Sequence, residues 1–349
     1  QRLSMRIETV NGAVWQPYLR RSAMTFLQHF LPGQPLEENG HHSAGLMWRN
    51  RAEQGDGGWL YGADVDLARI WLRENQARPI VDGSAFLQAT RPAGAHYDFD
   101  VDAINLAVYA QREWRVGERA QLSAGLRLEH AVYDYENFLA AGNNDENGMP
   151  CGFGGCLYTR PDDRRDRFTN AAPKLSWRYS VSPATSVFVN LSRGFRAPQV
   201  TELYRLQSGQ EVADLDSETM DAIEFGLRSS GDAWRLAASA FAMTKRNVVL
   251  RDADGFNVSD GRTDHAGLEI DGSLSLGDRF ELAASASFAR HRYAFDRLAG
   301  RGEVISDGND VDTAPRTFGN ARATWYPFDE TTVDIEWEHS GSYYLDAAN

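Results

Sequence analysis

Apolar and polar residues alternate along most of the chain with a period of two. In residues 104–116 the even positions begin with Ile104, Leu106 and Val108, whereas Asn105 and Gln111 stand among the odd positions. The same alternation recurs at residues 121–129, 174–181, 223–228, 268–276 and 333–338. Because successive side chains of a β-strand point to opposite faces, this pattern predicts strands with one apolar and one polar face.

The connections between the predicted strands alternate between short and long. Short ones, rich in turn-forming residues, fall at residues 116–118, 182–184, 230–232, 277–278 and 327–329. Long polar ones fall near residues 136–168, 195–216, 246–262 and 292–315. Outer-membrane barrels have short turns at one end and long loops at the other. The sequence therefore predicts an all-β fold, a transmembrane antiparallel β-barrel of the outer-membrane type, in which about fourteen strands can be counted.

Aromatic residues near the short connections support the same fold. They are Trp59, Trp114, Trp177, Tyr179, Trp234, Trp325 and Tyr326. Membrane β-barrels carry girdles of such residues at the level of the lipid headgroups. The alternative is that they are core aromatics of a soluble protein. Their repetition on many strands favours the girdle.

Composition and charge exclude two classes of protein. The 349 residues contain 36 Lys and Arg against 49 Asp and Glu, and this net charge of −13 excludes nucleic-acid binding driven by phosphate neutralisation. The longest apolar stretch, Leu236 to Met243, is too short for a helix to cross a bilayer. A polar barrel interior behind an apolar outer belt accounts for the ordinary hydrophobic share of 42%.

Two cysteines, Cys151 and Cys156, lie in the glycine-rich segment CGFGGC, within a polar stretch. Cysteines this close in a polar loop favour a local disulfide formed in an oxidising compartment. A zinc site would need two further ligands, and this loop contains no histidine. The CxxC spacing of a redox motif is absent as well.

Residues 187–204 read VFVNLSRGFRAPQVTELY and resemble the barrel of TonB-dependent outer-membrane receptors. In that family a strand ends in Gly-Phe-Arg-Ala-Pro, Glu-Leu-Tyr follows, and the next strand carries Glu-x-Gly. The matching positions here are Gly194, Phe195, Arg196, Ala197, Pro198, Glu202, Leu203, Tyr204, Leu215, Glu218, Glu224 and Gly226, with a further element at Gly261, Thr263, His265, Gly267, Leu268 and Glu269. Ser217 stands where a proline is common.

The resemblance implies a barrel of about 22 strands closed by an N-terminal plug domain, which engages the energy-transducing TonB protein. Since about fourteen strands are fewer than that, we expect residues 1–349 to be part of the barrel domain, with the plug and the C-terminal strands outside this chain. The aromatic residue that usually ends family barrels is also not found at Asn349.

The function implied by the resemblance is TonB-coupled uptake of a scarce large solute across the outer membrane of a Gram-negative bacterium. A ferric siderophore is the most frequent cargo in the family. Its transport involves no covalent chemistry, so we expect no enzymatic activity, catalytic residue, cofactor or resident metal. Outer-membrane lipid and the TonB complex are the expected partners, and nucleic acid is not.

We interpret the motif residues as architectural. They are Gly194, Phe195, Pro198, Glu202, Glu224, Gly226, Gly267 and Glu269. Pro198 cannot donate to a strand ladder and is expected to end it, whereas Gly194 and Gly226 would permit close approach or a bulge. Glu224 and Glu269 are expected to face the lumen, where a charge is hydrated or paired.

Arginine, histidine and aromatic groups at the outer mouth are the candidates for contact with an anionic ferric chelate. The candidates are Arg193, Arg196, Tyr204, Arg205, Arg164, Arg165, His41 and His42. The alternative for each is an ordinary solvated loop charge.

Two other functions fit parts of the sequence. A passive porin of about 16 strands would fit this length. A soluble all-β lectin or hydrolase would explain two groups of acidic residues, Asp252 with Asp254 and Asp307 with Asp310 and Asp312. Those acids stand in glycine-rich turn sequences without the spacing of a calcium loop, and no catalytic triad is evident, so the receptor remains the favoured interpretation.

Overall fold

One large antiparallel sheet dominates the computed structural model, which describes residues 1–349 apart from the side chain of Arg301. The sheet has 15 strands and confirms the predicted fold class. Its long strands are β3 (Val14–Leu27), β4 (Leu36–Gln54), β5 (Gly57–Gln76), β6 (Gly94–Val116), β7 (Ala120–Asn137), β9 (Arg164–Ser180), β10 (Thr185–Arg196), β12 (Glu218–Ser230), β13 (Trp234–Arg251), β14 (Asn257–Leu276), β15 (Phe280–Tyr293), β18 (Thr317–Phe328) and β19 (Thr331–Ser340). The short strands β1 (Arg2–Ser4) and β2 (Ile7–Glu8) both pair with β3.

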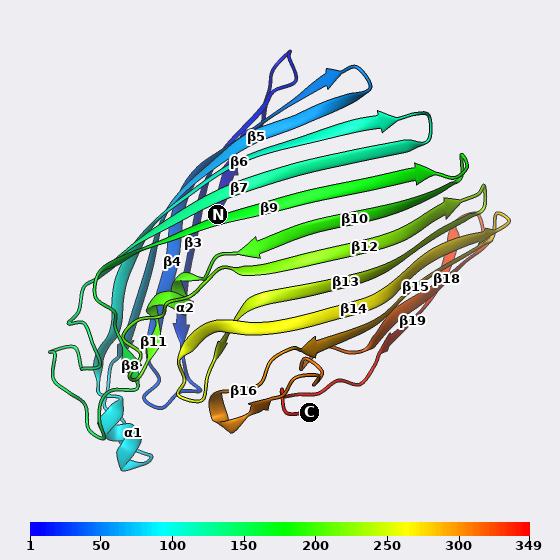
Figure 1. Ribbon diagram of the computed structural model, residues 1–349. Helices are drawn as coiled ribbons and strands as arrows, with labels where there is room; N and C mark the ends of the chain where they lie inside the picture. The colour runs from blue at the N-terminus through cyan, green and yellow to red at the C-terminus, as the bar shows by residue number, and fades with distance from the viewer.

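Consecutive long strands lie side by side, so the sheet curves around a central space as a barrel wall does (Figure 1). In the residues described, the sheet runs from β1 at one edge to β19 at the other. No helix within this part of the chain is long and apolar enough to cross a membrane.

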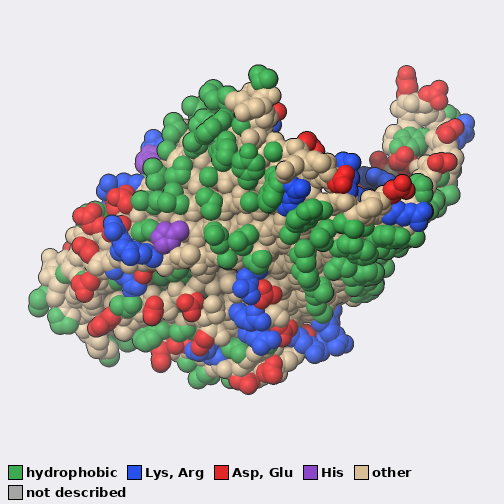
Figure 2. All heavy atoms as spheres, turned by 45° about the horizontal axis from the view of Figure 1, so that its top comes forward, with side chains coloured by type: hydrophobic (Ala, Val, Ile, Leu, Met, Phe, Trp, Pro, Cys, Tyr) green, Lys and Arg blue, Asp and Glu red, His purple; other side chains and the backbone are tan. Residues whose placement is uncertain are grey.

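The two faces of the sheet differ as the alternation predicts. On β6 the outward side chains of Ile104, Leu106 and Val108 are 42%, 48% and 56% exposed. Strand register continues this surface onto the neighbouring strands, since Ile104 lies beside Leu67 on one side and Val132 on the other. Patches of hydrophobic side chains gather over the middle of the face in Figure 2. So large an exposed apolar surface suits lipid and not water.

Tryptophans mark the short-turn edge of this apolar band. Trp59, Trp114, Trp177, Trp234 and Trp325 lie near the short turns, face outward and are 37–43% exposed. Their side chains share the face of Ile104 because each is an even number of residues from an outward apolar neighbour. The predicted girdle is confirmed for these five residues.

Short and long connections lie at opposite ends of the strands (Figure 1). The long connections span residues 77–93, 138–163, 197–217 and 294–316. The long loop predicted at 246–262 is wrong, because β13 continues to Arg251, β14 begins at Asn257, and residues 252–256 alone join them. These strand ends extend beyond the apolar band, where both faces are wet and the hydrophobic alternation disappears.

Short elements lie within the long loops, and those around α2 pack onto the inner face of the wall. They are α1 (Ala85–Thr90), β8 (Tyr158–Thr159), α2 (Val200–Tyr204), β11 (Leu206–Gln207), β16 (Arg297–Leu298), η1 (Gly300–Gly302) and β17 (Val304–Ile305). Leu203, Tyr204 and Leu206 pack with Phe99 and Tyr135 of the wall in a buried cluster. The protein's main hydrophobic core therefore lies inside the loop end of the wall.

Candidate functional site

Strand register divides the predicted ligand-contact residues between the two faces of the sheet. Three of them face outward, namely His42, Arg165 and Arg193. Three face inward, namely His41, Arg164 and Arg196. Tyr204 ends α2 and Arg205 follows it, on the inner side. The expected position at the mouth is wrong for the three outward residues, because neighbours in a strand, such as Arg164 and Arg165, point to opposite faces. Ligand contact by the five inward residues stays a prediction.

The outward residues have partners on the same face. His42 packs against Trp71, with ring centroids 5.0 Å apart. Arg165 forms an ion pair with Asp134, and Arg193 forms one with Asp221 at 2.6 Å. None of these three positions borders the interior through which a solute would pass.

Arg205 forms the centre of a buried ionic cluster on the inner side. Glu37 of β4 and Glu74 of β5 are register partners and both face inward. Arg205 forms an ion pair with each of them, with its Nη2 3.0 Å from Glu37 Oε2. The Glu74 side chain is 1% exposed, so these pairs hold the loop after α2 against the wall.

His96 completes the surroundings of Glu74. Its Nδ1 lies 3.1 Å from Glu74 Oε1, and its Nε2 lies 2.9 Å from the carbonyl oxygen of Pro92. Burial opposes the charge of Glu74, but the hydrogen bond from His96 and the positive charge of Arg205 hold its pKa below the ordinary value. Glu74 therefore carries a negative charge that its cationic neighbours balance.

Arg196 connects the end of β10 to α2 and β12. Its Nε lies 2.7 Å from Glu218, and its Nη1 lies 3.0 Å from Glu202. Glu202 also accepts a hydrogen bond of 2.7 Å from the backbone N–H of Gln199, at the start of α2. Lys245 of β13 contacts Glu218 at 2.9 Å. The receptor-like motif residues thus anchor the loop that follows β10, in agreement with an architectural role.

Tyr204 anchors the same loop from its other end. Its hydroxyl donates a hydrogen bond of 2.7 Å to Asp166, which also pairs with Arg164, and its ring stacks on Tyr135 with centroids 4.3 Å apart. Tyr204 is fully buried, and burial together with the bond to Asp166 raises the pKa of its hydroxyl. A side chain without exposed surface positions its neighbours and does not itself touch a solute.

The other motif residues are explained by packing. A Cβ on Gly226 would overlap the ring of Phe188, and one on Gly267 would lie 2.7 Å from the ring of Phe241, so close approach is confirmed there. The prediction of close approach is wrong for Gly194, where a Cβ would meet nothing within 4 Å.

The remaining predictions about this motif concern the strand end and two glutamates. Strand β10 ends two residues before the buried Pro198, as expected. Phe195 faces outward beside Thr219. Glu224 and Glu269 both face the interior by register, and Glu224 accepts a hydrogen bond of 3.0 Å from Asn190.

Two exposed phenylalanines at the loop end were missed by the sequence reasoning. Cys151 and Cys156 form the predicted disulfide. Phe153, at the tip of that loop, is 69% exposed and packs edge to face on Phe86 of α1, with ring centroids 5.6 Å apart. The signal that could have found Phe153 is its position between two glycines in a constrained loop, where a large apolar side chain has no core to enter.

The described residues contain no group of three or more His, Cys, Asp or Glu side chains placed to hold a metal ion. The site thus consists of paired charges and packed aromatic rings on the inner side, together with two exposed phenylalanines on the long loops. This arrangement suits recognition of a solute.

Comparison with known protein families identifies the family of this chain. Residues 10–349 match the family model described as TonB dependent receptor-like, beta-barrel. The chain belongs to the TonB-dependent receptor family. Members of this family are receptors and transporters, and their barrels lie in the outer membrane, as the apolar band requires.

Solved structures of TonB-dependent receptors share the fold. The ferric yersiniabactin uptake receptor FyuA of Yersinia pestis superposes with a TM-score of 0.70 at 15% identity, covering 100% of this chain and 50% of FyuA. The siderophore receptor PiuA of Acinetobacter baumannii gives 0.72 at 12% identity, covering 100% and 55%. The copper transporter OprC gives 0.72 at 15% identity, covering 97% and 51%. The chain spans about half the length of these proteins.

Proposed function

We propose that this chain forms part of the barrel wall of a receptor. The receptor takes up a ferric siderophore across the outer membrane with energy delivered through TonB. The observation that carries the proposal is the family match over residues 10–349. The polar inner face behind an apolar outer band supports it, because a hydrated lumen is what a large polar solute needs. The TonB contact is assigned to a plug domain, which we expect outside residues 1–349.

A siderophore is the proposed cargo because FyuA and PiuA are described as receptors for such compounds. OprC is described as a copper transporter, so a different metal cargo is the competing outcome. Ferric chelates present aromatic or anionic groups, which aromatic rings and guanidinium groups recognise.

Within this proposal the first contact is made by Phe86 and Phe153. They are 43% and 69% exposed, they lie on two different long loops, and they already touch each other. An aromatic pair of this kind provides apolar surface at small entropic cost, since each ring has only two side-chain torsions. Arg196 and Lys245, which face inward with side chains 36% and 34% exposed, are the proposed inner contacts.

The test is uptake of radioactive iron by cells that produce the complete receptor as their single route for a given siderophore. Uptake is expected with TonB and a proton-motive force, and is expected to stop when either is removed. The double variant Phe86→Ala/Phe153→Ala should weaken siderophore binding about tenfold, since each exposed aromatic contact is worth about 0.5–1.5 kcal/mol. Phe328→Ala is the matched control, because Phe328 is 75% exposed at the opposite, short-turn end.

Uptake that persists without TonB, together with steady ohmic conductance of the complete protein, would contradict the proposal in favour of a passive porin. Accumulation of copper without accumulation of ferric chelates would retain the transporter but replace its cargo.

A further inference from the structure

A row of polar side chains crosses the outer face of five strands immediately above the apolar band. Register places Arg193 of β10 beside Asp221 of β12, followed by Thr244 of β13, Asp264 of β14 and Arg292 of β15. We call these five residues the polar row. The next outward row toward the short turns consists of Leu191, Ile223, Ala242, Ala266 and Arg290. From β10 to β14 a charged line therefore meets an apolar surface, and on β15 both rows carry an arginine.

The polar row lies at the level of the outer lipid headgroups. On β15 the outward side chains from Phe280 to Phe288 are all apolar, and Arg290 and Arg292 follow them. Ten residues of strand, tilted as in membrane barrels, separate Phe280 from Arg290, which corresponds to about 25 Å along the membrane normal. This is the height of the apolar band of such barrels, so the two guanidinium groups stand where the outer leaflet's hydrocarbon ends.

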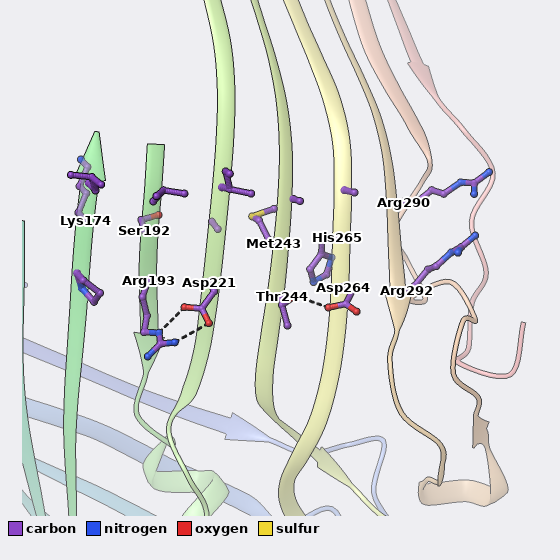
Figure 3. Close-up of a pocket in the computed structure, with 17 residues that line it drawn as sticks. Lys174, Ser192, Arg193, Asp221, Met243, Thr244, Asp264, His265, Arg290 and Arg292 are labelled. Carbon is purple, nitrogen blue, oxygen red and sulfur yellow. Dashed lines mark hydrogen bonds and ion pairs between the residues drawn. The ribbon is translucent and has the colours of Figure 1, made fainter. Parts of the chain in front are cut away.

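A depression of about 930 Å³ opens on the outer face where these two rows meet (Figure 3). Ala242 and Ala266, which belong to the second row, line the depression between the larger side chains of Ile223 and Arg290. The charged side chains of the polar row line its loop side. The cavity therefore has an apolar half on the membrane side and a charged half at headgroup level.

The charges around this depression leave two arginines without acidic partners. Asp221 is held by Arg193 at 2.6 Å and by Arg246 at 2.5 Å. Asp264 accepts a hydrogen bond of 2.7 Å from Thr244. Arg290 and Arg292 extend away from both acids, and no ion pair joins either of them to another of the residues drawn in Figure 3. Their donors are available to an external anion.

The balance of positive and negative side chains at this level of the outer face is different on the neighbouring strands. On β10–β15 the outward charges in the polar row and in the rows directly next to it are five arginines and two aspartates, namely Arg193, Arg246, Arg262, Arg290, Arg292, Asp221 and Asp264. On β5–β9 they are four arginines and five acids, namely Arg69, Arg73, Arg165, Arg167, Asp98, Asp100, Asp102, Asp134 and Glu136. The excess of positive charge is thus local to the depression.

We infer that this depression binds a phosphorylated lipid of the outer leaflet. Arg290 and Arg292 bind its phosphate, because guanidinium groups form paired hydrogen bonds with phosphate oxygens. One acyl chain lies over Ala242 and Ala266. A free phosphate would leave this apolar half empty, and a soluble protein cannot reach a surface that lies inside the hydrocarbon layer. A lipid matches both halves at once.

The test is native mass spectrometry of the complete protein in detergent, titrated with three lipids. Diphosphorylated lipid A and phosphatidylglycerol supply phosphate groups with a net negative charge, and phosphatidylcholine supplies a zwitterionic headgroup. We expect both anionic lipids to be retained more tightly than phosphatidylcholine. The variant Arg290→Gln/Arg292→Gln should weaken their retention about tenfold or more, because each charge-assisted bond contributes substantially.

Two further variants separate charge from shape. Arg165→Gln/Arg167→Gln removes two arginines from the same level of β9 and should leave lipid retention unchanged. Ala242→Leu fills the apolar half of the depression on a lipid-facing surface and should weaken retention without changing any charge. Equal retention of phosphatidylcholine, full competition by millimolar inorganic phosphate, or an equal loss in the β9 variant would overturn the inference.

Discussion

Arg205→Met removes the charge that lies between Glu37 and Glu74 while keeping a similar apolar stem. Their side chains are 7% and 1% exposed, so two carboxylates then face each other across paired strands without their shared cation. Removing one partner of a buried ion pair costs about 3–5 kcal/mol. His96 and Arg91 stay near Glu74, at 3.1 and 3.5 Å, so we expect the lower end of that range, about 3 kcal/mol.

The loss should depend on pH in a defined direction. The lowered pKa of Glu74 contributes stability above the ordinary value of 4.5, and this contribution is lost as the pH falls through the lower folded value. In Arg205→Met the charge of Arg205 no longer opposes the effect of burial, so the pKa of Glu74 rises. Glu74 then becomes protonated as the pH falls, and this reduces the loss of stability in the variant. The difference in the free energy of unfolding between the wild-type protein and Arg205→Met is therefore largest at neutral pH and becomes smaller toward pH 4.

The measurement is urea unfolding in lipid vesicles, followed by tryptophan fluorescence at pH 7 and at pH 4.5. Arg6→Met is the control, because the Arg6 and Glu8 side chains of that ion pair are 53% and 60% exposed and such pairs contribute about 0–1 kcal/mol. Combining Arg205→Met with Glu37→Gln should recover part of the loss. A cost below 1 kcal/mol at pH 7, or an equal cost at both pH values, would refute the reasoning.

Three further outcomes are expected. Gly226→Val should lower the free energy of unfolding by about 1–3 kcal/mol, because its side chain overlaps an aromatic ring, whereas Gly194→Ala should change it little; equal effects in urea unfolding would contradict this. Cys151→Ser/Cys156→Ser should speed proteolysis within the loop and leave barrel unfolding unchanged, since the short loop closed by the disulfide contributes about 2 kcal/mol locally. Tyr204→Phe should cost about 1 kcal/mol, and a gain in stability would show that its hydroxyl is not needed there.

The wall could be predicted from sequence because its two faces meet different solvents. Ile104 and Asn105 are neighbours in the chain, but one faces lipid and the other the interior, so polarity alone reveals the strand. Beyond the apolar band this contrast is lost. Lys245 and Arg246 point to opposite faces and are both charged, so the sequence pattern predicts a loop where β13 and β14 in fact continue as strands.

The candidate site was less predictable, for two physical reasons. The chemistry of a side chain does not reveal which face of a strand it occupies. Alternation does, because Arg165 is an even number of residues from the outward Leu175, and Arg193 is two residues from the outward Leu191. The contact of Arg205 with Glu74 joins residues 131 positions apart, and no local pattern encodes it. Such pairings arise only when the strand order of the whole sheet is known.

The disulfide loop is attached to α1 by its main chain. The N–H of Gly152 donates to the carbonyl of Ala89 at 3.1 Å, and that of Leu157 donates to Thr90 at 2.9 Å. Backbone groups are the same in every residue type, so this attachment does not depend on which side chains the loop carries. A side chain at the tip, such as that of Phe153, can therefore be replaced while the two loops stay joined.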